Sequence, residues 1–308
     1  MECKRAIIDL GTNTFHLLIA GRSEGQVKIC LRMQIPVKLG EKGINQRKIS
    51  PEAYQRGMDA LMLFHLTMQE HEVEQVTAFG TSAIRDATNG RAFIDEAMKR
   101  FNIVIVPIPG DLEASLIYHG VFHSFPFPDK PVLVMDIGGG SVEFIIGSGK
   151  NLLWKKSYPI GAARLLETYH SCEPIAHNQI SLLEQFLADE LYELLDKATA
   201  YKVTTLIGAA GSFETLTDVL KKDLSRLSQS LSQHASIVNL SDFYQFHRLM
   251  VLSDNESRKA LNGMLDFRVD MIVVASILMN FILGRLPVRE LIVSEFSLKE
   301  GMLYGEPD

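Results

Sequence analysis

Short apolar runs alternate with amphipathic segments along the whole chain, which is the pattern of an α/β protein. The first three runs, at residues 5–10, 14–20 and about 27–35, are separated only by short turns, so they predict hairpin-connected strands. Further strands are expected at residues 75–79, 103–108, 132–137, 142–146, 151–158, 205–207 and 290–293.

Helix signals separate the later strands. Ser50 is an N-cap residue, Pro51 suits the first helical position, and Glu52 places an acid in the first turn, so a helix is predicted to about residue 71. Gly80-Thr81-Ser82 leads from a strand into another helical segment, with Ser82 as the expected N-cap. Other helices are expected at residues 111–122, 178–200, 269–283 and near 298–303, and the polar segment 220–265 is interpreted as helical.

A proline-rich linker divides the chain. Residues 124–131 read SFPFPDKP, and after them the strand-turn-strand pattern begins again. A chain of 308 residues is too long for one average core and suits two domains of roughly 100–200 residues each. We therefore predict domains at residues 1–125 and 126–308.

An internal repeat spans the two halves. IIDLGTNTFHLLIAG, beginning at Ile7, aligns without a gap on VMDIGGGSVEFIIGS, beginning at Val134. Asp9 falls on Asp136, Gly11 on Gly138 and Thr14 on Ser141. Two hairpins could resemble one another by chance, but the matched Asp-x-Gly at one pleat position favours a duplication.

Each copy offers a turn suited to phosphate. Glycine lets a ligand approach bare backbone, and such turns direct N–H groups at anions. A third turn, between a short strand and a helix, reads Gly-Ala-Ala-Gly-Ser from residue 208. The candidate phosphate-binding residues of the three turns are Gly11, Thr12, Asn13, Thr14, Gly138, Gly139, Gly140, Ser141, Gly208, Gly211 and Ser212.

Charged residues near these turns complete the candidate chemistry. Asp9 and Asp136 end buried strands, where an unpaired carboxylate costs several kcal/mol, and Glu143 interrupts an apolar strand. Paired carboxylates bind hard cations, so Asp9 and Asp136 predict a site for a divalent metal, Mg²⁺ or Mn²⁺, while Glu143 shares a strand face with Ser141. Arg85 begins a helix, where a cation is unfavourable unless it binds an anion; the alternative is a surface pair with Asp86.

Composition excludes several classes of protein. The net charge of −6 does not favour nucleic acid or an anionic membrane surface. Cys3, Cys30 and Cys172 show no CxxC spacing, which argues against a disulfide framework and a zinc site. We find neither a signal-peptide pattern nor an apolar run of the roughly 18 residues that a membrane span needs, so we expect a cytoplasmic protein.

The motifs, in their order, resemble the exopolyphosphatase / guanosine pentaphosphate phosphohydrolase (Ppx/GppA) family in its short, two-domain form. They are IDLGTNTFHLL, GTSAIRDATNG, PGDLEASLIYHGV, VMDIGGGSVEF, YPIGAARL, the turn at Gly208 and VSEFSLKEGML. The resemblance implies two ribonuclease-H-like domains of the actin, sugar-kinase and heat-shock-chaperone ATPase superfamily, with a cleft between them. The last helix, about 297–305, is a candidate to pack back on the first domain.

The resemblance also implies roles. Glu113 matches the family's general base, Asp136 and Glu143 match acids that hold Mg²⁺, and Arg85 matches the arginine of its T-S-A-x-R-x-A segment. The expected substrates are polyphosphate or guanosine pentaphosphate, and a homodimer is left open. The sequence departs from the family at the third turn, which usually reads Gly-Thr-Gly-Gly-Thr, and at Lys299, where arginine is usual.

Two other functions stay open on the same residues. A non-catalytic sensor would bind an alarmone or nucleotide in the same cleft, and the altered third turn motivates it. An ATP-dependent phosphotransferase would transfer phosphate to an acceptor other than water.

Overall fold

The structure is a computed structural model that describes residues 4–23, 26–226 and 229–305. It divides into two compact units, the first ending at Glu113 and the second running from Ala114 to Gly305. The division falls inside helix α4 (Gly110–Phe122), so the proline-rich residues 124–131 lie within the second unit. The domain bounds predicted from the sequence, 1–125 and 126–308, stay a prediction.

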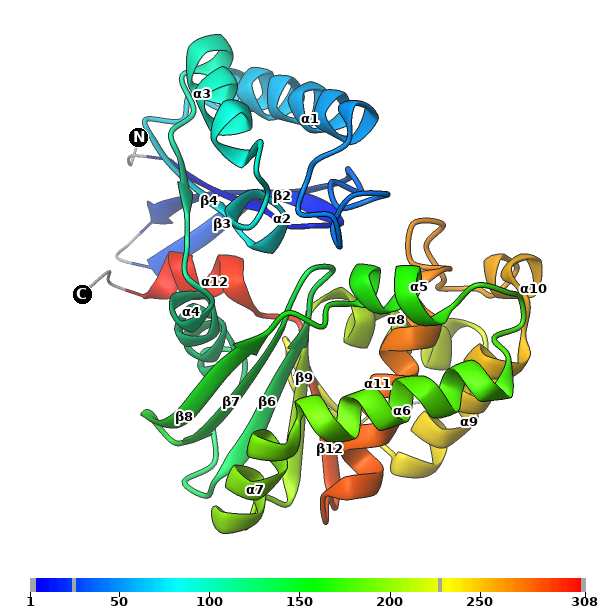
Figure 1. Ribbon diagram of the computed structural model, residues 1–308. Helices are drawn as coiled ribbons and strands as arrows, with labels where there is room; N and C mark the ends of the chain where they lie inside the picture. Colours follow the sequence, from blue (N-terminus) through cyan, green and yellow to red (C-terminus); the bar gives the residue numbers. More distant parts are fainter. Residues whose placement is uncertain (1–3, 24–25, 227–228, 306–308) are drawn as a thin grey trace. The chain divides into compact units, whose positions relative to one another are not determined.

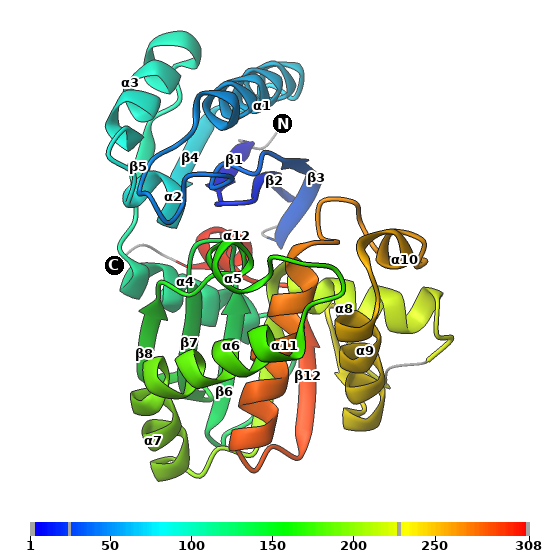
Figure 2. The same ribbon diagram turned by 45° about the vertical axis from the view of Figure 1, so that its right-hand side comes forward.

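The first unit is built on a five-stranded mixed sheet in the order β3-β2-β1-β4-β5. Strands β1, β2 and β3 form an antiparallel meander, and β4 and β5 continue the sheet parallel to β1. Helices α1 and α3 lie on one face of this sheet (Figures 1 and 2). The elements are β1 (Arg5–Leu10), β2 (Thr14–Ser23), β3 (Gln26–Pro36), α1 (Pro51–Glu70), β4 (Gln75–Gly80), α2 (Ser82–Arg85), α3 (Gly90–Phe101) and β5 (Ile105–Pro107).

The second unit repeats this topology and extends it. Its sheet has the order β10-β11-β12-β9-β6-β7-β8, in which β8-β7-β6-β9-β12 has the pairing pattern of β3-β2-β1-β4-β5. An antiparallel hairpin, β10 and β11, is added beside β12. The strands are β6 (Val132–Ile137), β7 (Val142–Ser148), β8 (Asn151–Tyr158), β9 (Thr205–Ala209), β10 (Gln229–Ser232), β11 (Ala235–Val238) and β12 (Glu290–Ser294).

Helices cover the second sheet. Helices α6 and α11 lie against one of its faces (Figure 2), and α8 packs on β6, β9 and β12. Helix α11 is apolar on all sides and nearly wholly buried, as expected of a central core helix. The helices are α4, α5 (Ala162–Tyr169), α6 (His177–Glu190), α7 (Tyr192–Ala200), α8 (Ala210–Lys222), α9 (Leu240–Leu252), α10 (Asn255–Lys259), α11 (Met271–Arg285) and α12 (Leu298–Tyr304).

Strand register confirms the internal repeat. In the first hairpin Asp9 lies opposite His16, and in the second Asp136 lies opposite Glu143, as the alignment requires. The chain is therefore an α/β protein with two mixed sheets of one topology, as its sequence predicts.

Local predictions differ in accuracy. Ser50 caps α1 as predicted, because its hydroxyl accepts a hydrogen bond from the N–H of Ala53. At α2, however, the N-cap is Thr81 and Ser82 is the first helical residue. The segment 220–265 is not wholly helical, because it contains the β10–β11 hairpin, whose four-residue strands are too short to show a clear apolar periodicity.

The described residues support two further expectations. In this part of the chain no helix combines the length and the apolar character that crossing a bilayer requires. Cys30 and Cys172 are free and exposed, while Cys3 lies outside the described residues.

Candidate active site

The first phosphate turn joins β1 to β2. The N–H of Gly11 donates to the carbonyl of Thr14 at 3.1 Å. A Cβ on Gly11 would lie 2.8 Å from that carbonyl oxygen, so close backbone approach requires glycine. The carbonyls of Thr12 and Asn13 are taken by residues 37–40, with the N–H of Lys38 donating to Asn13 at 2.7 Å. The carbonyl side of the turn is thus occupied by the protein itself.

Two buried side chains of this turn lack protein partners. Within the described ranges, neither amide atom of Asn13 nor the hydroxyl of Thr14 makes a hydrogen bond. Asn13 is 6% exposed and Thr14 is 5% exposed. A buried polar group without a partner costs about 1–3 kcal/mol, so such groups call for a ligand or water.

The second turn joins β6 to β7 and has the same closure. The N–H of Gly138 donates to the carbonyl of Ser141 at 3.0 Å, and a Cβ on Gly138 would lie 3.0 Å from that oxygen. Its carbonyls are again occupied, here by the start of α5: Ala162 and Ala163 donate to Gly138 and Gly139 at 2.9 Å each. Across the described residues, the N–H groups of Gly139 and Gly140 donate to no protein acceptor.

The segment Tyr158–Arg164 has a clear structural role. Arg164 Nε donates to the carbonyl of Gly140 at 2.8 Å. A Cβ on Gly161 would lie 2.4 Å from Gly139, so this glycine lets α5 approach the turn. The YPIGAARL motif therefore holds the glycine turn in place through hydrogen bonds to its carbonyl groups.

Two acids stand opposite one another beside this turn. Asp136 is 6% exposed and Glu143 is 1% exposed, and the two are cross-strand partners in β6 and β7. Ser157 donates to Glu143 Oε1 at 2.6 Å, and the Ser297 hydroxyl donates to Asp136 Oδ2. Burial raises the pKa of Asp136 to about 6, although the hydrogen bond from Ser297 and the charge of Lys299 act to lower it.

The third turn is shorter than its sequence suggests. Strand β9 ends at Ala209 and α8 begins at Ala210. Gly208 lies within the strand, and a Cβ there would meet the ring of Phe213 at 2.1 Å, so packing accounts for this glycine. Ala210 has a φ of 64°, a conformation that favours glycine. Of the three predicted phosphate-binding residues of this turn, only Gly211 and Ser212 lie in the first turn of α8, where N–H groups lack helical partners.

A cation that the sequence analysis missed covers this turn. A Cβ on Gly211 would lie 1.7 Å from a guanidinium nitrogen of Arg268, so the guanidinium lies directly on the backbone of Gly211. Burial lowers the pKa of Arg268, and the charges of Glu214 and Asp136 oppose that change. Arg268 therefore lies within electrostatic reach of Asp136. Nothing in the local sequence singles it out, because its neighbours at Asp136 and Gly211 are distant along the chain.

Arg85 and Glu113 form an ion pair in the first unit. Arg85 Nη1 lies 3.0 Å from Glu113 Oε2 and 2.9 Å from the carbonyl of Ile108, and Nε lies 3.2 Å from Asp86 Oδ1. Burial acts to lower the pKa of Arg85, but Glu113 and Asp86 outweigh it and raise the pKa. Both roles considered for Arg85 therefore remain compatible, because the pair with Asp86 leaves Nη2 for an anion. Within the described residues, Nη2 makes no hydrogen bond.

The acids fit a magnesium ion only as a partial ligand set. No group of three or more His, Cys, Asp or Glu side chains in the described ranges is arranged to hold a metal by itself. Mg²⁺, however, keeps several waters and commonly takes one or two carboxylates together with substrate phosphates. The buried pair Asp136 and Glu143 suits that mode, and a cation would relieve the cost of charging Asp136. Asp9 lies in β1 of the first unit, one residue before the strand ends, and the predicted three-acid set stays a prediction.

Comparisons with known proteins agree with these features. Residues 18–308 match the model of the Ppx/GppA phosphatase family. The chain is 37% identical to an exopolyphosphatase from Cytophaga hutchinsonii, with a TM-score of 0.93 over 98% of this chain and 96% of that one. It is 26% identical to a PPX-GPPA enzyme from Aquifex aeolicus, with a TM-score of 0.80 over 99% of this chain and 100% of that one.

A curated relative is longer. A guanosine-5'-triphosphate,3'-diphosphate pyrophosphatase from Photobacterium profundum is 28% identical over 299 residues, which are 97% of this chain but 58% of that protein. The chain thus spans little more than half the length of this relative. The family match over residues 18–308, and the shared fold and motifs, show that the chain belongs to the Ppx/GppA phosphatase family.

Proposed function

We propose that this protein removes terminal phosphate from polyphosphate or guanosine pentaphosphate by metal-dependent hydrolysis. The observation that carries the proposal is the pair of similar turns, whose carbonyls are occupied by the protein. Among the described residues, the N–H groups of Gly139 and Gly140 and the side chains of Asn13 and Thr14 have no protein partner and are left for a ligand. The similarity to the Cytophaga exopolyphosphatase and to the Photobacterium guanosine-5'-triphosphate,3'-diphosphate pyrophosphatase supports these two substrates.

In this proposal the phosphate chain is held by the turns. Thr12, Asn13 and Thr14 donate hydrogen bonds to phosphate oxygens, and Gly139 and Gly140 donate their backbone N–H groups. Gly211 and Ser212, at the start of α8, hold a further phosphate together with Arg268, which lies on Gly211. We make no such assignment for Gly208, whose place in β9 is explained by the Phe213 ring.

The acids of the second unit would hold the cation. Asp136 and Glu143 bind Mg²⁺ or Mn²⁺ together with phosphate oxygens, and Asp9 is the proposed third acid. When bound, the ion neutralises charge that develops on the transferring phosphoryl group. Ser297 and Ser157 fix the two carboxylates by hydrogen bonds, so they present their remaining oxygens in defined directions.

Glu113 is the proposed general base. Its side chain is only 8% exposed and is oriented by Arg85 at 3.0 Å. Glu113 accepts a proton from the attacking water, and Arg85 stabilises the charge of the phosphoryl group through its remaining nitrogen. These roles require that the two units present their acids and turns to one cleft, which is part of the proposal.

One specific observation favours the alternative hypothesis of a non-catalytic sensor. Ala210 adopts a left-handed backbone conformation at the turn where the family usually has glycine. A methyl group and strain at that position would weaken the grip on one phosphate. A sensor would bind the same ligands without turnover.

The decisive assay is phosphate release from polyphosphates of several lengths and from guanosine penta- and tetraphosphate. We expect release that depends on Mg²⁺, is abolished by EDTA, and is restored by added Mg²⁺. Binding of these ligands without release would support the sensor instead. ADP formation from ATP that requires an added acceptor would support a phosphotransferase.

A further inference from the structure

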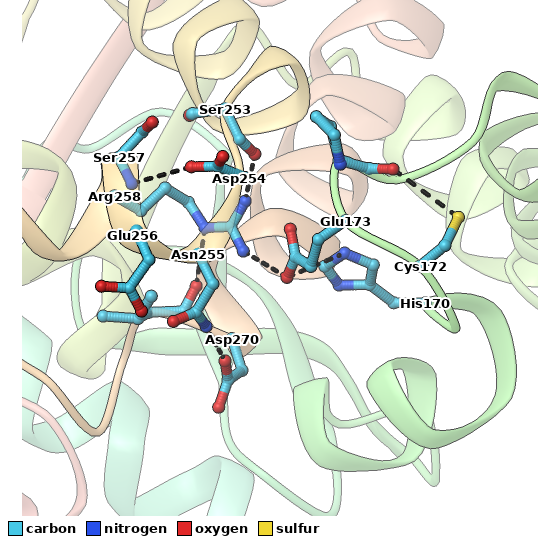
Figure 3. Close-up of polar contacts among 12 residues, drawn as sticks. His170, Cys172, Glu173, Ser253, Asp254, Asn255, Glu256, Ser257, Arg258 and Asp270 are labelled. Carbon is cyan, nitrogen blue, oxygen red and sulfur yellow. Dashed lines mark hydrogen bonds and ion pairs between the residues drawn. The ribbon is translucent and has the colours of Figure 1, made fainter.

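Arg258 is a buried cation that the proposed reaction does not use. It lies in the short helix α10, and its side chain is 0% exposed. Nε donates to the carbonyl of Val269 at 3.0 Å, Nη1 donates to the carbonyl of Ser253, and Nη2 donates to Glu173 Oε1 at 2.5 Å. Figure 3 shows the guanidinium lying between Ser253 and Glu173. One side chain thus ties the residues on both sides of α10, Ser253 and Val269, to Glu173, which is 85 positions away in the sequence.

The segment held by Arg258 is the one that carries Arg268. Val269 directly follows Arg268, and its carbonyl is the acceptor of Arg258 Nε. A second contact holds the next residue, because Asn255 Nδ2 donates to Asp270 Oδ1 at 2.5 Å (Figure 3). Helix α10 therefore fixes both residues that lie between Arg268 and helix α11.

The other anchor of Arg258 leads to the glycine turn. Glu173 lies between α5 and α6, and the start of α5 occupies the carbonyls of Gly138 and Gly139. Arg258 is consequently hydrogen-bonded both to the residue Glu173 that follows α5, the helix packed on the second turn, and to Val269, the neighbour of Arg268. A charge on Arg258 is tolerated in the interior because Glu173 pairs with it and each of its nitrogens has an acceptor.

We propose that Arg258 is a positioning residue for phosphate binding: by holding Val269 and Glu173 it keeps the Arg268 guanidinium on the Gly211 turn, beside Asp136. This inference rests on the proposed function in one respect, which is that Arg268 binds a phosphate of the substrate. A buried arginine with only a stabilising role would lower the melting temperature but would leave substrate affinity of the folded protein unchanged.

The test compares single variants with a double variant. Arg258→Lys keeps the charge but replaces a planar fork with one ammonium, which cannot reach three acceptors in different directions. Arg268→Gln removes the cation on the Gly211 turn. For wild type, both single variants and the double variant, we would measure KM and kcat for tripolyphosphate with Mg²⁺, tripolyphosphate binding by calorimetry, and the melting temperature.

The expected result is a coupled effect on affinity. Arg268→Gln should weaken tripolyphosphate binding roughly tenfold or more. Loss of a charge-assisted hydrogen bond, or of a residue that orients a ligand-binding group, typically lowers affinity by such a factor. Arg258→Lys should weaken it by part of that factor with a smaller change in kcat. The double variant should bind no more weakly than Arg268→Gln alone, because residues that act through one another are not additive.

Two results would overturn the inference. One is wild-type affinity in folded Arg258→Lys; the other is a double variant whose loss is the product of the single losses. If Arg258→Lys does not fold, Asn255→Ala carries the same test through the contact to Asp270. Failure of the proposed function is distinguishable, because in that case wild type releases no phosphate although calorimetry still reports whether Arg258 controls binding.

Discussion

The two copies of the strand-Asp-Gly turn share their geometry and differ in their chemistry. Both close with a glycine N–H on a Thr or Ser carbonyl, at 3.1 Å in the first copy and 3.0 Å in the second. The first copy carries Thr12, Asn13 and, opposite Asp9, His16. The second has Gly139, Gly140 and, opposite Asp136, Glu143. The two copies thus share their backbone geometry but not their side chains.

This difference indicates a division of labour between the units. In the proposed function the first unit supplies neutral and cationic donors, namely Asn13, Thr14 and Arg85, together with the base Glu113. The second unit supplies bare amides and the buried acid pair Asp136 and Glu143. We infer that the first unit binds the phosphate chain and activates the attacking water, while the second unit holds the cation. Variants that act on one unit should therefore separate these properties.

The largest effect is expected from the acid of the first unit. Glu113→Gln removes the proposed proton acceptor while keeping the shape, so kcat should fall by about 10²–10⁴-fold. Binding of tripolyphosphate with Mg²⁺, measured by calorimetry, should be retained. Asp111→Asn changes an exposed acid in the same first turn of α4 and serves as the control. Near-normal turnover in Glu113→Gln would show that the base assignment is wrong.

The acid of the second unit should instead control stability and metal response. The pKa of Asp136 is raised to about 6 from 3.8, so the folded protein binds this proton more tightly than the unfolded chain. Without metal, the free energy of unfolding should then fall as pH rises from about 4 to above 6, by about 3 kcal/mol in all. Asp136→Asn should remove most of this fall, as measured by denaturant unfolding in EDTA.

Asp196→Asn provides the matched comparison for that pH series. Asp196 is an exposed carboxylate of α7 in the same unit. Its replacement should leave the pH dependence of unfolding unchanged. If Asp136→Asn and Asp196→Asn give the same curves as wild type, burial of the Asp136 charge does not cost stability as described.

Asn13 separates binding from stability in the first turn. Its buried amide atoms make no hydrogen bond within the described residues, so Asn13→Ala should cost less than about 1 kcal/mol of stability. The same change should raise KM for tripolyphosphate, because a donor to phosphate is lost. Asn89 is the control, because its side-chain amide accepts a hydrogen bond from the N–H of Ile49 and donates one to the carbonyl of Ile49, each at 2.9 Å. Asn89→Ala should do the reverse, with a loss of about 1–3 kcal/mol and an unchanged KM.

The smallest effect concerns strain at the third turn. Ala210 has a φ of 64°, so Ala210→Gly should raise the free energy of unfolding by about 1 kcal/mol. Ala209, with a φ of −126°, is extended, and Ala209→Gly should destabilise by about 0.5–1 kcal/mol. Melting curves of the two variants, which differ by one position, would show whether the strain is local to Ala210. Destabilisation by both would contradict it.

The sequence predicted those parts of the site that local pattern controls. The Asp-x-Gly repeat, the alternating strands and the Ser50 cap are each signalled within a few residues, and the structure places them as expected. The contacts of Asp136 could not be predicted in this way, because Ser297 is 161 positions away and Arg268 reaches the site only through tertiary packing. The β10–β11 hairpin escaped notice for a related reason, since its short strands join the sheet through the pairing of β11 with β12.

The central claim is that the two copies bind different parts of one ligand. Its most direct test is calorimetric binding of tripolyphosphate to wild type, Asn13→Ala and Asp136→Asn, each with Mg²⁺ and with EDTA. We predict that Mg²⁺ strengthens binding to wild type and to Asn13→Ala by a similar factor, although Asn13→Ala binds more weakly in both conditions. For Asp136→Asn we predict that Mg²⁺ no longer strengthens binding. An unchanged Mg²⁺ effect in Asp136→Asn would contradict the assignment of the cation to the second copy.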